Sequence, residues 1–224
     1  ANGEQLILDY ELRDTVISTN NEVVVKTGSD HLLTFSGLDK IKNTGEGLSY
    51  NKITVPRGGE YSLKLPDGTV VWVNAASTLE FPSVFSENER RVKLSGEGYV
   101  DVTSDASKPV IVETEKMDIQ VVGTQFNVRS YEDESATHAT LVEGSISATT
   151  QETTPLMLKP GQQAWFNGQF LEKREVDVLL YTSWKNGKFV FYKTPLEDIC
   201  RQISRWYDVD ITFTNDDLKK INFT

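Results

Sequence analysis

Short runs of β-branched and aromatic residues recur along the first 182 residues, with turn-forming residues between them. Val, Ile, Thr, Tyr and Phe at this spacing are typical of the strands of a β-sandwich or barrel. No long amphipathic helix pattern occurs before residue 183. We therefore predict a mainly β domain over residues 1–182. Its predicted strands cover residues 22–27, 61–65, 70–74, 91–94, 100–103, 110–113, 119–122, 126–130, 137–142 and 145–148.

The clearest hairpin turns at Asp67-Gly68, between two alternating segments. Asp-Gly favours the positive backbone angles of a tight hairpin turn. A two-residue loop pairs Leu65 with Val70, whereas a bulged three-residue loop reverses the parity of the paired residues. Both loops fit the sequence.

From residue 183 onward the pattern changes to strand, helix, strand. Residues 188–192 alternate, with Phe189 and Phe191 on one face, and residues 209–213 again resemble a strand. Between them lies an apolar stripe at helical spacing. The stripe consists of Leu196, Ile199, Cys200, Ile203, Trp206 and Tyr207.

The start of this helix has the residues of a capping box. Thr194 is the expected N-cap, Pro195 suits the first helical position, and Glu197 completes the box. Residues 221–223 indicate the start of one more strand, so we expect the native chain to continue. Because one helix on two short strands buries little apolar surface, residues 183–224 are predicted to be a small, incomplete α+β module.

Charge separates the two parts further. The chain has 33 acidic and 23 basic residues, and its net charge is −10. Residues 183–224 hold seven basic and six acidic residues, so their net charge is +1 and that of residues 1–182 is −11. A strongly acidic domain repels the phosphates of nucleic acids, and we expect no nucleic-acid partner. The single cysteine, Cys200, excludes an internal disulfide and a multi-cysteine zinc site.

Candidate catalytic residues form no reactive set in the sequence. His31 and His138 have no partner at metal-ligand spacing, and each is interpreted as a surface or loop residue. The acidic residues 132–134 follow a strand and are interpreted as a solvated loop. Cys200 lies on the apolar stripe without a nearby histidine, so we expect a buried, unreactive thiol. We therefore expect neither enzymatic activity nor a metal or other cofactor.

An ordered series of motifs runs from about residue 50 to residue 224, with its core over residues 50–165. The motifs are VPRGGEY (55–61), LPDGTVVWVNAAS (65–77), VKLSGEGY (92–99), VVGTQFNV (121–128), LVEGS (141–145), LKPGQ (158–162), WKNGKFVF (184–191) and RWYDV (205–209). This series resembles the FecR family of transmembrane anti-sigma regulators, in particular its Bacteroidetes-type members. The last two motifs resemble the C-terminal module of such proteins.

The resemblance implies a function that composition does not. FecR-family members have a cytoplasmic segment that holds a sigma factor, one inner-membrane helix, and a periplasmic region that this chain resembles. The periplasmic region is implied to receive a signal from the N-terminal signalling domain of a TonB-dependent outer-membrane transporter. The implied fold is a jelly-roll-like sandwich, followed by half of a domain similar to the short secretin and TonB-receptor N-terminal domain. The sigma-binding segment is absent from these residues, so sigma binding is expected elsewhere.

The expected contact with the signalling domain is an edge strand of the C-terminal module. An exposed strand has unpaired N–H and C=O groups that a partner strand can pair. The candidate residues are Lys188, Phe189, Val190, Phe191, Tyr192, Trp206, Tyr207 and Phe213. The aromatic residues in this set equally fit the module's own core.

Two alternatives depend on other residues. Some proteins similar to this family are thought to cut themselves at a Gly-Thr pair, which marks Gly123-Thr124. No base is evident for such a step, and we favour a packing role for this glycine.

The alternative function is carbohydrate binding by a jelly roll. Its candidates Trp72, Tyr99, Trp165 and Phe166 can stack on sugar faces. Their alternating strand positions favour packing inside the sandwich instead.

Overall fold

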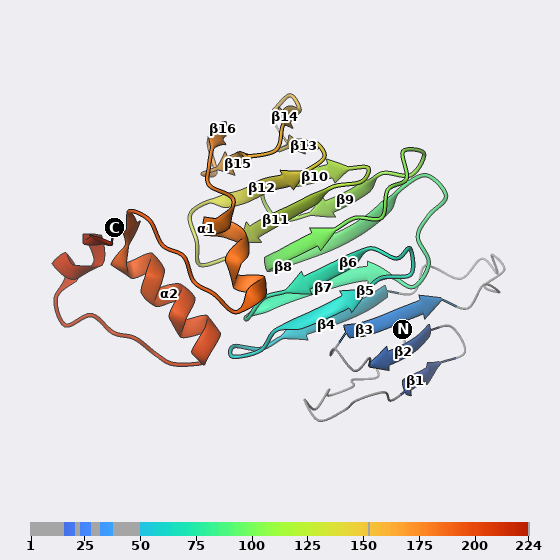
Figure 1. Ribbon diagram of the computed structural model, residues 1–224, viewed down its shortest axis with the longest axis horizontal. Coiled ribbons are helices and arrows are strands. Elements are labelled where there is room, and N and C mark those ends of the chain that lie inside the picture. The colour runs from blue at the N-terminus through green and yellow to red at the C-terminus, as the bar shows by residue number, and fades with distance from the viewer. Residues whose placement is uncertain (1–15, 21–22, 28–31, 38–49, 152, 224) are drawn as a thin grey trace.

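The computed structural model describes residues 16–20, 23–27, 32–37, 50–151 and 153–223. These residues form mainly strands, with short helices at the C-terminal end (Figure 1). The mainly β fold is therefore as predicted. No helix in the described ranges combines the length and the apolar character that crossing a membrane requires. The predicted role of His31 lies outside the described residues.

The strands form two sheets that share one strand. The first sheet has the order β1-β2-β3-β5-β6-β8-β11-β12-β15-β16. Its strands are β1 (Val16–Asn20), β2 (Val23–Thr27), β3 (Leu32–Gly37), β5 (Tyr61–Lys64), β6 (Val70–Val73), β8 (Arg90–Asp101), β11 (Gln125–Ser130), β12 (Thr137–Glu143), β15 (Gln162–Phe166) and β16 (Leu171–Glu175). Only β3 and β5 pair in parallel among these described strands.

The second sheet runs β4-β7-β8-β9-β10-β13-β14, and its parallel pair is β8 with β9. Its other strands are β4 (Tyr50–Val55), β7 (Ser77–Pro82), β9 (Val110–Glu113), β10 (Asp118–Val121), β13 (Ile146–Thr149) and β14 (Leu156–Leu158). One apolar core lies between the two sheets and draws residues from both. It includes Leu63, Val71, Phe126 and Leu141 from the first sheet, and Leu79, Phe81, Ile119 and Ile146 from the second.

Strand β8 crosses from one sheet to the other. Its first half pairs with β7 and β9, and its second half pairs with β6 and β11. The change falls at Gly96, whose φ is +99° and where a Cβ would lie 2.2 Å from Ser77 Oγ. Only glycine fits this bend. The two strands predicted at 91–94 and 100–103 are therefore one continuous strand.

The Asp-Gly hairpin between β5 and β6 has the longer loop. Leu63 pairs with Val71, and Leu65 N donates to Thr69 O at 2.8 Å. This register leaves three residues in the loop, with Gly68 at a φ of +88°. As a result Val71 faces the core while Trp72 points to the opposite face of the sheet.

The C-terminal part is largely helical. Its elements are α1 (Leu179–Thr182), η1 (Ser183–Asn186), β17 (Thr194–Pro195), α2 (Leu196–Tyr207), η2 (Asp216–Lys220) and β18 (Asn222–Phe223). The predicted helix and the short final strand are confirmed, and β18 pairs with β17. In Figure 1, α1 lies in front of the sheet and α2 lies beside it.

Three local predictions for this part were wrong. Residues 188–192 and 209–213 form no strand, because no strand in the described chain pairs with them. The capping box is not formed either. Pro195 is the N-cap, Leu196 N donates to Ile221 O at 2.8 Å, and Thr194 Oγ1 bonds to Tyr192 O instead. The β18 end of the chain thus supplies the acceptor that Thr194 was expected to provide.

Candidate functional site

The first sheet has a second face, opposite the core, that the C-terminal segment covers. Along β11, Phe126 and Val128 point into the core, so Asn127 and Arg129 point outward. Trp184 of η1 covers this face and is 6% exposed. Its indole Nε1 donates to Asn127 Oδ1 at 2.9 Å. These contacts anchor the first C-terminal turns on the sheet.

A buried carboxylate, Glu97 of β8, organises the polar groups of this face. It is 3% exposed. Its Oε1 accepts from Asn127 Nδ2 at 3.0 Å, and its Oε2 accepts from Asn74 Nδ2 at 2.9 Å and from Arg129 Nη1 at 3.2 Å. Glu97 therefore receives three side-chain hydrogen bonds, so both of its buried carboxylate oxygens have partners.

Arg129 connects this network of hydrogen bonds to the loop between β11 and β12. Its Nε and Nη2 donate to the two carboxylate oxygens of Glu134 at 2.8 and 2.7 Å. This two-pronged geometry is the strong form of an arginine–carboxylate pair. The Glu134 side chain is 10% exposed. The interpretation of residues 132–134 as a solvated loop was therefore wrong for Glu134, because a sheet arginine folds this carboxylate inward.

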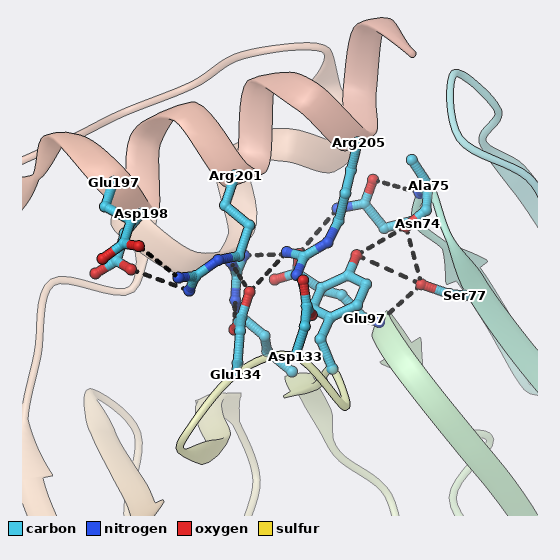
Figure 2. A network of polar contacts seen from close by, with 12 residues as sticks. Asn74, Ala75, Ser77, Glu97, Asp133, Glu134, Glu197, Asp198, Arg201 and Arg205 are labelled. Carbon is cyan, nitrogen blue, oxygen red and sulfur yellow. Dashed lines mark hydrogen bonds and ion pairs between the residues drawn. The ribbon is translucent and has the colours of Figure 1, made fainter. Parts of the chain in front are cut away.

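Helix α2 completes the network through Arg205 (Figure 2). Arg205 Nη1 donates to Glu134 Oε1 at 2.6 Å, and Nη2 donates to Asp133 Oδ1 at 2.5 Å. Its guanidinium also lies 3.7 Å from the ring centre of Tyr131, whose hydroxyl donates to Ala75 O. A planar guanidinium suits both stacking and paired hydrogen bonds.

The protonation states match this arrangement. Burial alone would raise the pKa of Glu134, but Arg129 and Arg205 outweigh it and lower the pKa to about 2. Burial opposes the charge of Arg129, yet Glu97 and Glu134 raise its pKa above the ordinary value. The buried charges of Glu97 and Glu134 are thus balanced by Arg129 and Arg205.

A second contact holds the C-terminal end of α2. Arg57, in the turn between β4 and β5, donates from Nη2 to Ser204 O at 3.2 Å and to Val209 O at 2.6 Å. It also pairs with Asp208 and Asp210, and the neighbouring Gly58 N donates to Arg205 O. A cation at a helix C-terminus satisfies its free carbonyls and favours its dipole.

The predicted contact residues are partly brought together. Phe189 and Phe191 stack with ring centres 5.8 Å apart, and Phe189 meets Trp206 at 5.3 Å and Tyr207 at 6.4 Å. Phe213 lies apart from these rings, with Lys219 over its face. Lys188, Val190, Tyr192 and Tyr207 are exposed.

Phe189 also lines a narrow cleft between the sandwich and α2. The lining residues are Asn74, Glu97, Arg129, Tyr131, Phe189, Gln202, Arg205 and Trp206.

The pair Gly123-Thr124 is tightly packed. A Cβ at Gly123 would lie 2.6 Å from Ser104 Oγ, so glycine permits a close approach here. Thr124 is 3% exposed, and its hydroxyl donates to Ser145 O at 3.0 Å.

The aromatic residues of the carbohydrate alternative mostly lie outside the core. Trp72 and Tyr99 are neighbours on the outer face, with Lys185 Nζ 5.3 and 3.7 Å from their ring centres. Arg174 lies 3.6 Å from Trp165. Phe166 packs against the core, as predicted. The prediction that all four residues fill the sandwich was therefore wrong for Trp72, Tyr99 and Trp165. Lys185 lies over the rings of Trp72 and Tyr99, and Arg174 lies over the ring of Trp165.

His138 and Cys200 also differ from expectation. His138 lies on β12 beneath Tyr181 of α1, and its Nδ1 is buried without a partner in the described chain. Burial, aided by Arg129, lowers its pKa to about 4. Cys200 is half-buried. Within the described ranges, no three His, Cys, Asp or Glu residues group closely enough to hold a metal ion.

Sequence reasoning missed Arg205, Glu134 and Glu97 as a connected set. The available signal was weak. Glu97 and Arg129 occupy outward positions in strands, which normally indicates solvent exposure. Only the covering helices show that this face is buried.

Comparisons with known proteins agree with the motifs. The family model "FecR protein" matches residues 51–147, and "FecR, C-terminal" matches residues 188–224. A crystal structure of a candidate anti-sigma factor from Parabacteroides distasonis at 2.50 Å is 30% identical, with a TM-score of 0.68. The match covers 71% of this chain and 76% of that one. A second crystal structure of a candidate anti-sigma factor from the same species, at 1.65 Å, gives 30% identity, a TM-score of 0.67, and coverage of 70% and 75%. No curated protein matches.

Proposed function

This chain belongs to the FecR family, and from that premise we propose that it is the periplasmic sensory region of a single-pass inner-membrane anti-sigma factor. It receives a signal from the N-terminal signalling domain of a TonB-dependent outer-membrane transporter by protein–protein contact. A cytoplasmic segment outside these residues then acts on the sigma factor.

The regulatory role rests on the family and on its solved relatives. Both family models match in the expected order, first over the sandwich and then over the C-terminal part. FecR proteins are regulators rather than enzymes, and this chain takes part in anti-sigma regulation. The transporter, the periplasm and the inner membrane are the finer part of the proposal.

The observation that carries the contact proposal is the segment 188–192. Its side chains alternate, with Lys188, Val190 and Tyr192 exposed and the two phenylalanines half-buried. Residues 189–193 donate no hydrogen bond from backbone to backbone in the described structure. Residues 188–192 thus have the side-chain pattern of a strand, and the N–H groups of residues 189–192 have no backbone acceptor in the described structure, which favours strand addition by a partner.

The test is calorimetric titration of this chain with the signalling domain of the transporter encoded beside it. Val190→Pro removes one N–H that has no backbone acceptor in the described structure, and it should abolish binding. Val190→Thr keeps both the N–H and the β-branched shape, and it should bind like the native chain. Equal binding by the proline variant would exclude strand pairing at this segment. A native chain that does not bind would exclude the transporter as partner.

A further inference from the structure

The contacts of α2 suggest how the proposed binding segment is regulated. We propose that α2 is a releasable latch, held on the sandwich by Arg205 and Arg57, and that pairing of a partner strand with residues 188–192 releases it. The latch itself follows from the intramolecular contacts, and its role in signalling rests on the proposed function.

The two C-terminal helices are held in different ways. The α1–η1 segment is anchored by the buried Trp184 and Thr182, so leaving the sheet would expose a large aromatic ring to water. In α2 the buried residues are Ile199 and Arg205, and its contacts with the sandwich are ion pairs, hydrogen bonds to backbone groups and the stacking of Arg205 on the Tyr131 ring. Water can replace such polar contacts, whereas it cannot replace apolar packing.

Charge balance makes the docked position of α2 specific. Arg129 alone cannot neutralise both Glu97 and Glu134, and Arg205 supplies the second positive charge (Figure 2). When α2 leaves, this side of the sandwich keeps three carboxylates, those of Glu97, Asp133 and Glu134, and one arginine, Arg129. The local charge of this side of the sandwich therefore differs between the docked and the released state of α2, so release of the helix changes the surface that the sandwich presents.

The segment between the anchor and the latch can serve as a hinge. It begins at Gly187 with a φ of +68° and ends near Lys193 with a φ of +50°. Lys188 N donates to Ser183 O, and the following five residues have no backbone donor bonds in the described chain. Few hydrogen bonds oppose a change of its backbone angles.

Phe189 links the hinge to the latch. Its ring contacts Trp206 and lines the cleft next to Arg205. A strand paired along residues 188–192 must be extended, with about 3.3 Å per residue. Straightening this irregular segment withdraws Phe189 from Trp206 and the cleft. Partner pairing and helix docking therefore compete, and the partner binds the released state.

The first experiment measures release without a partner. Gly58 N donates to Arg205 O, so hydrogen exchange at the Gly58 amide reports departure of the helix end. Arg205→Gln should accelerate this exchange by about tenfold or more. The matched control is Arg201→Gln on the same helix, because Arg201 pairs with Glu197 and Asp198 of α2 itself. Arg205→Lys keeps the positive charge, so its Gly58 exchange rate should lie between those of Arg201→Gln and Arg205→Gln. Equal Gly58 exchange rates in all three variants would contradict the proposal that Arg205 holds α2 on the sandwich.

The second experiment locks the helix. A Cβ at Gly58 would lie 3.4 Å from Asp208 Cβ, close to the spacing of a disulfide. Gly58→Cys with Asp208→Cys, in a Cys200→Ser background, should close α2 when oxidised. The oxidised form should bind the signalling domain at least about tenfold more weakly than the same protein after reduction, because the locked state is binding-incompetent.

The outcomes separate the two proposals. Equal affinity before and after reduction, with the native chain binding, would overturn the competition while leaving the proposed partner intact. If the native chain does not bind, the proposed partner is wrong, and exchange at Gly58 still decides whether α2 is a latch.

Discussion

Arg205 of α2 places its Nη1 2.6 Å from Oε1 of Glu134, a residue 71 positions earlier in the chain. Glu134 also binds Arg129 of β11 through both carboxylate oxygens. One carboxylate thus joins an arginine of the sheet to an arginine of the helix. The position of α2 is therefore part of the electrostatic balance of the sandwich.

A double-mutant cycle measures this link. Arg205→Gln and Glu134→Gln should be non-additive in urea denaturation, with a coupling free energy of about 1–3 kcal/mol, because the pair is largely buried. The control cycle is Arg201→Gln with Asp198→Asn, a pair within α2 whose side chains are 28% and 44% exposed. Its coupling should stay below about 0.5 kcal/mol. Similar couplings in both cycles would contradict the buried network.

Trp184 should be more sensitive to substitution than Trp206. Trp184→Phe removes the N–H that satisfies Asn127 Oδ1. The free energy of unfolding should fall by about 1–3 kcal/mol, since a buried acceptor loses its donor. Trp206 is half-buried, and its indole makes no hydrogen bond within the described residues, so Trp206→Phe should cost under about 1 kcal/mol. If Trp184 were not an anchor, Trp184→Phe would lower the denaturation midpoint less than Trp206→Phe does.

The pH dependence of stability should include His138. Its pKa is about 4 in the folded chain, against the ordinary 6.5, because burial and Arg129 disfavour the cation. The unfolded chain binds the proton first as pH falls. The stabilising contribution is therefore complete above pH 6.5 and is lost between 6.5 and 4, by up to about 1.4 kcal/mol per pH unit. His138→Gln should flatten urea stability curves in this window. An unchanged slope would exclude His138 as the cause.

Alanine substitutions at Gly144 and Gly161 should distinguish the cost of steric crowding from the cost of backbone strain. Both have positive φ, +92° and +83°. A Cβ at Gly144 would lie 2.7 Å from Gly123 O, whereas a Cβ at Gly161 would meet nothing within 4 Å. Gly161→Ala should cost about 1–2 kcal/mol from φ alone. Gly144→Ala should cost about 1–3 kcal/mol more through overpacking. Equal losses in thermal unfolding would show that the Gly123–Gly144 approach relaxes freely.

Sequence patterning determined the class of the fold and the site of the main helix. Period-two apolar positions in strands such as β11 and β12 decide which side chains enter a core, whatever the partner strands are. The stripe from Leu196 to Tyr207 likewise suffices to predict α2, because helical spacing is a local property. The FecR resemblance followed from ordered motifs in the same way.

Tertiary structure alone decided what lies on the outer face of the sheet. Glu97, Arg129 and Glu134 are typical surface residues by sequence, and they become buried only because η1 and α2 cover them. Residues 188–192 show the converse, since a strand-like pattern remains without a partner strand. Burial of a charge and pairing of a strand both depend on groups far away in the sequence, and local pattern cannot supply them.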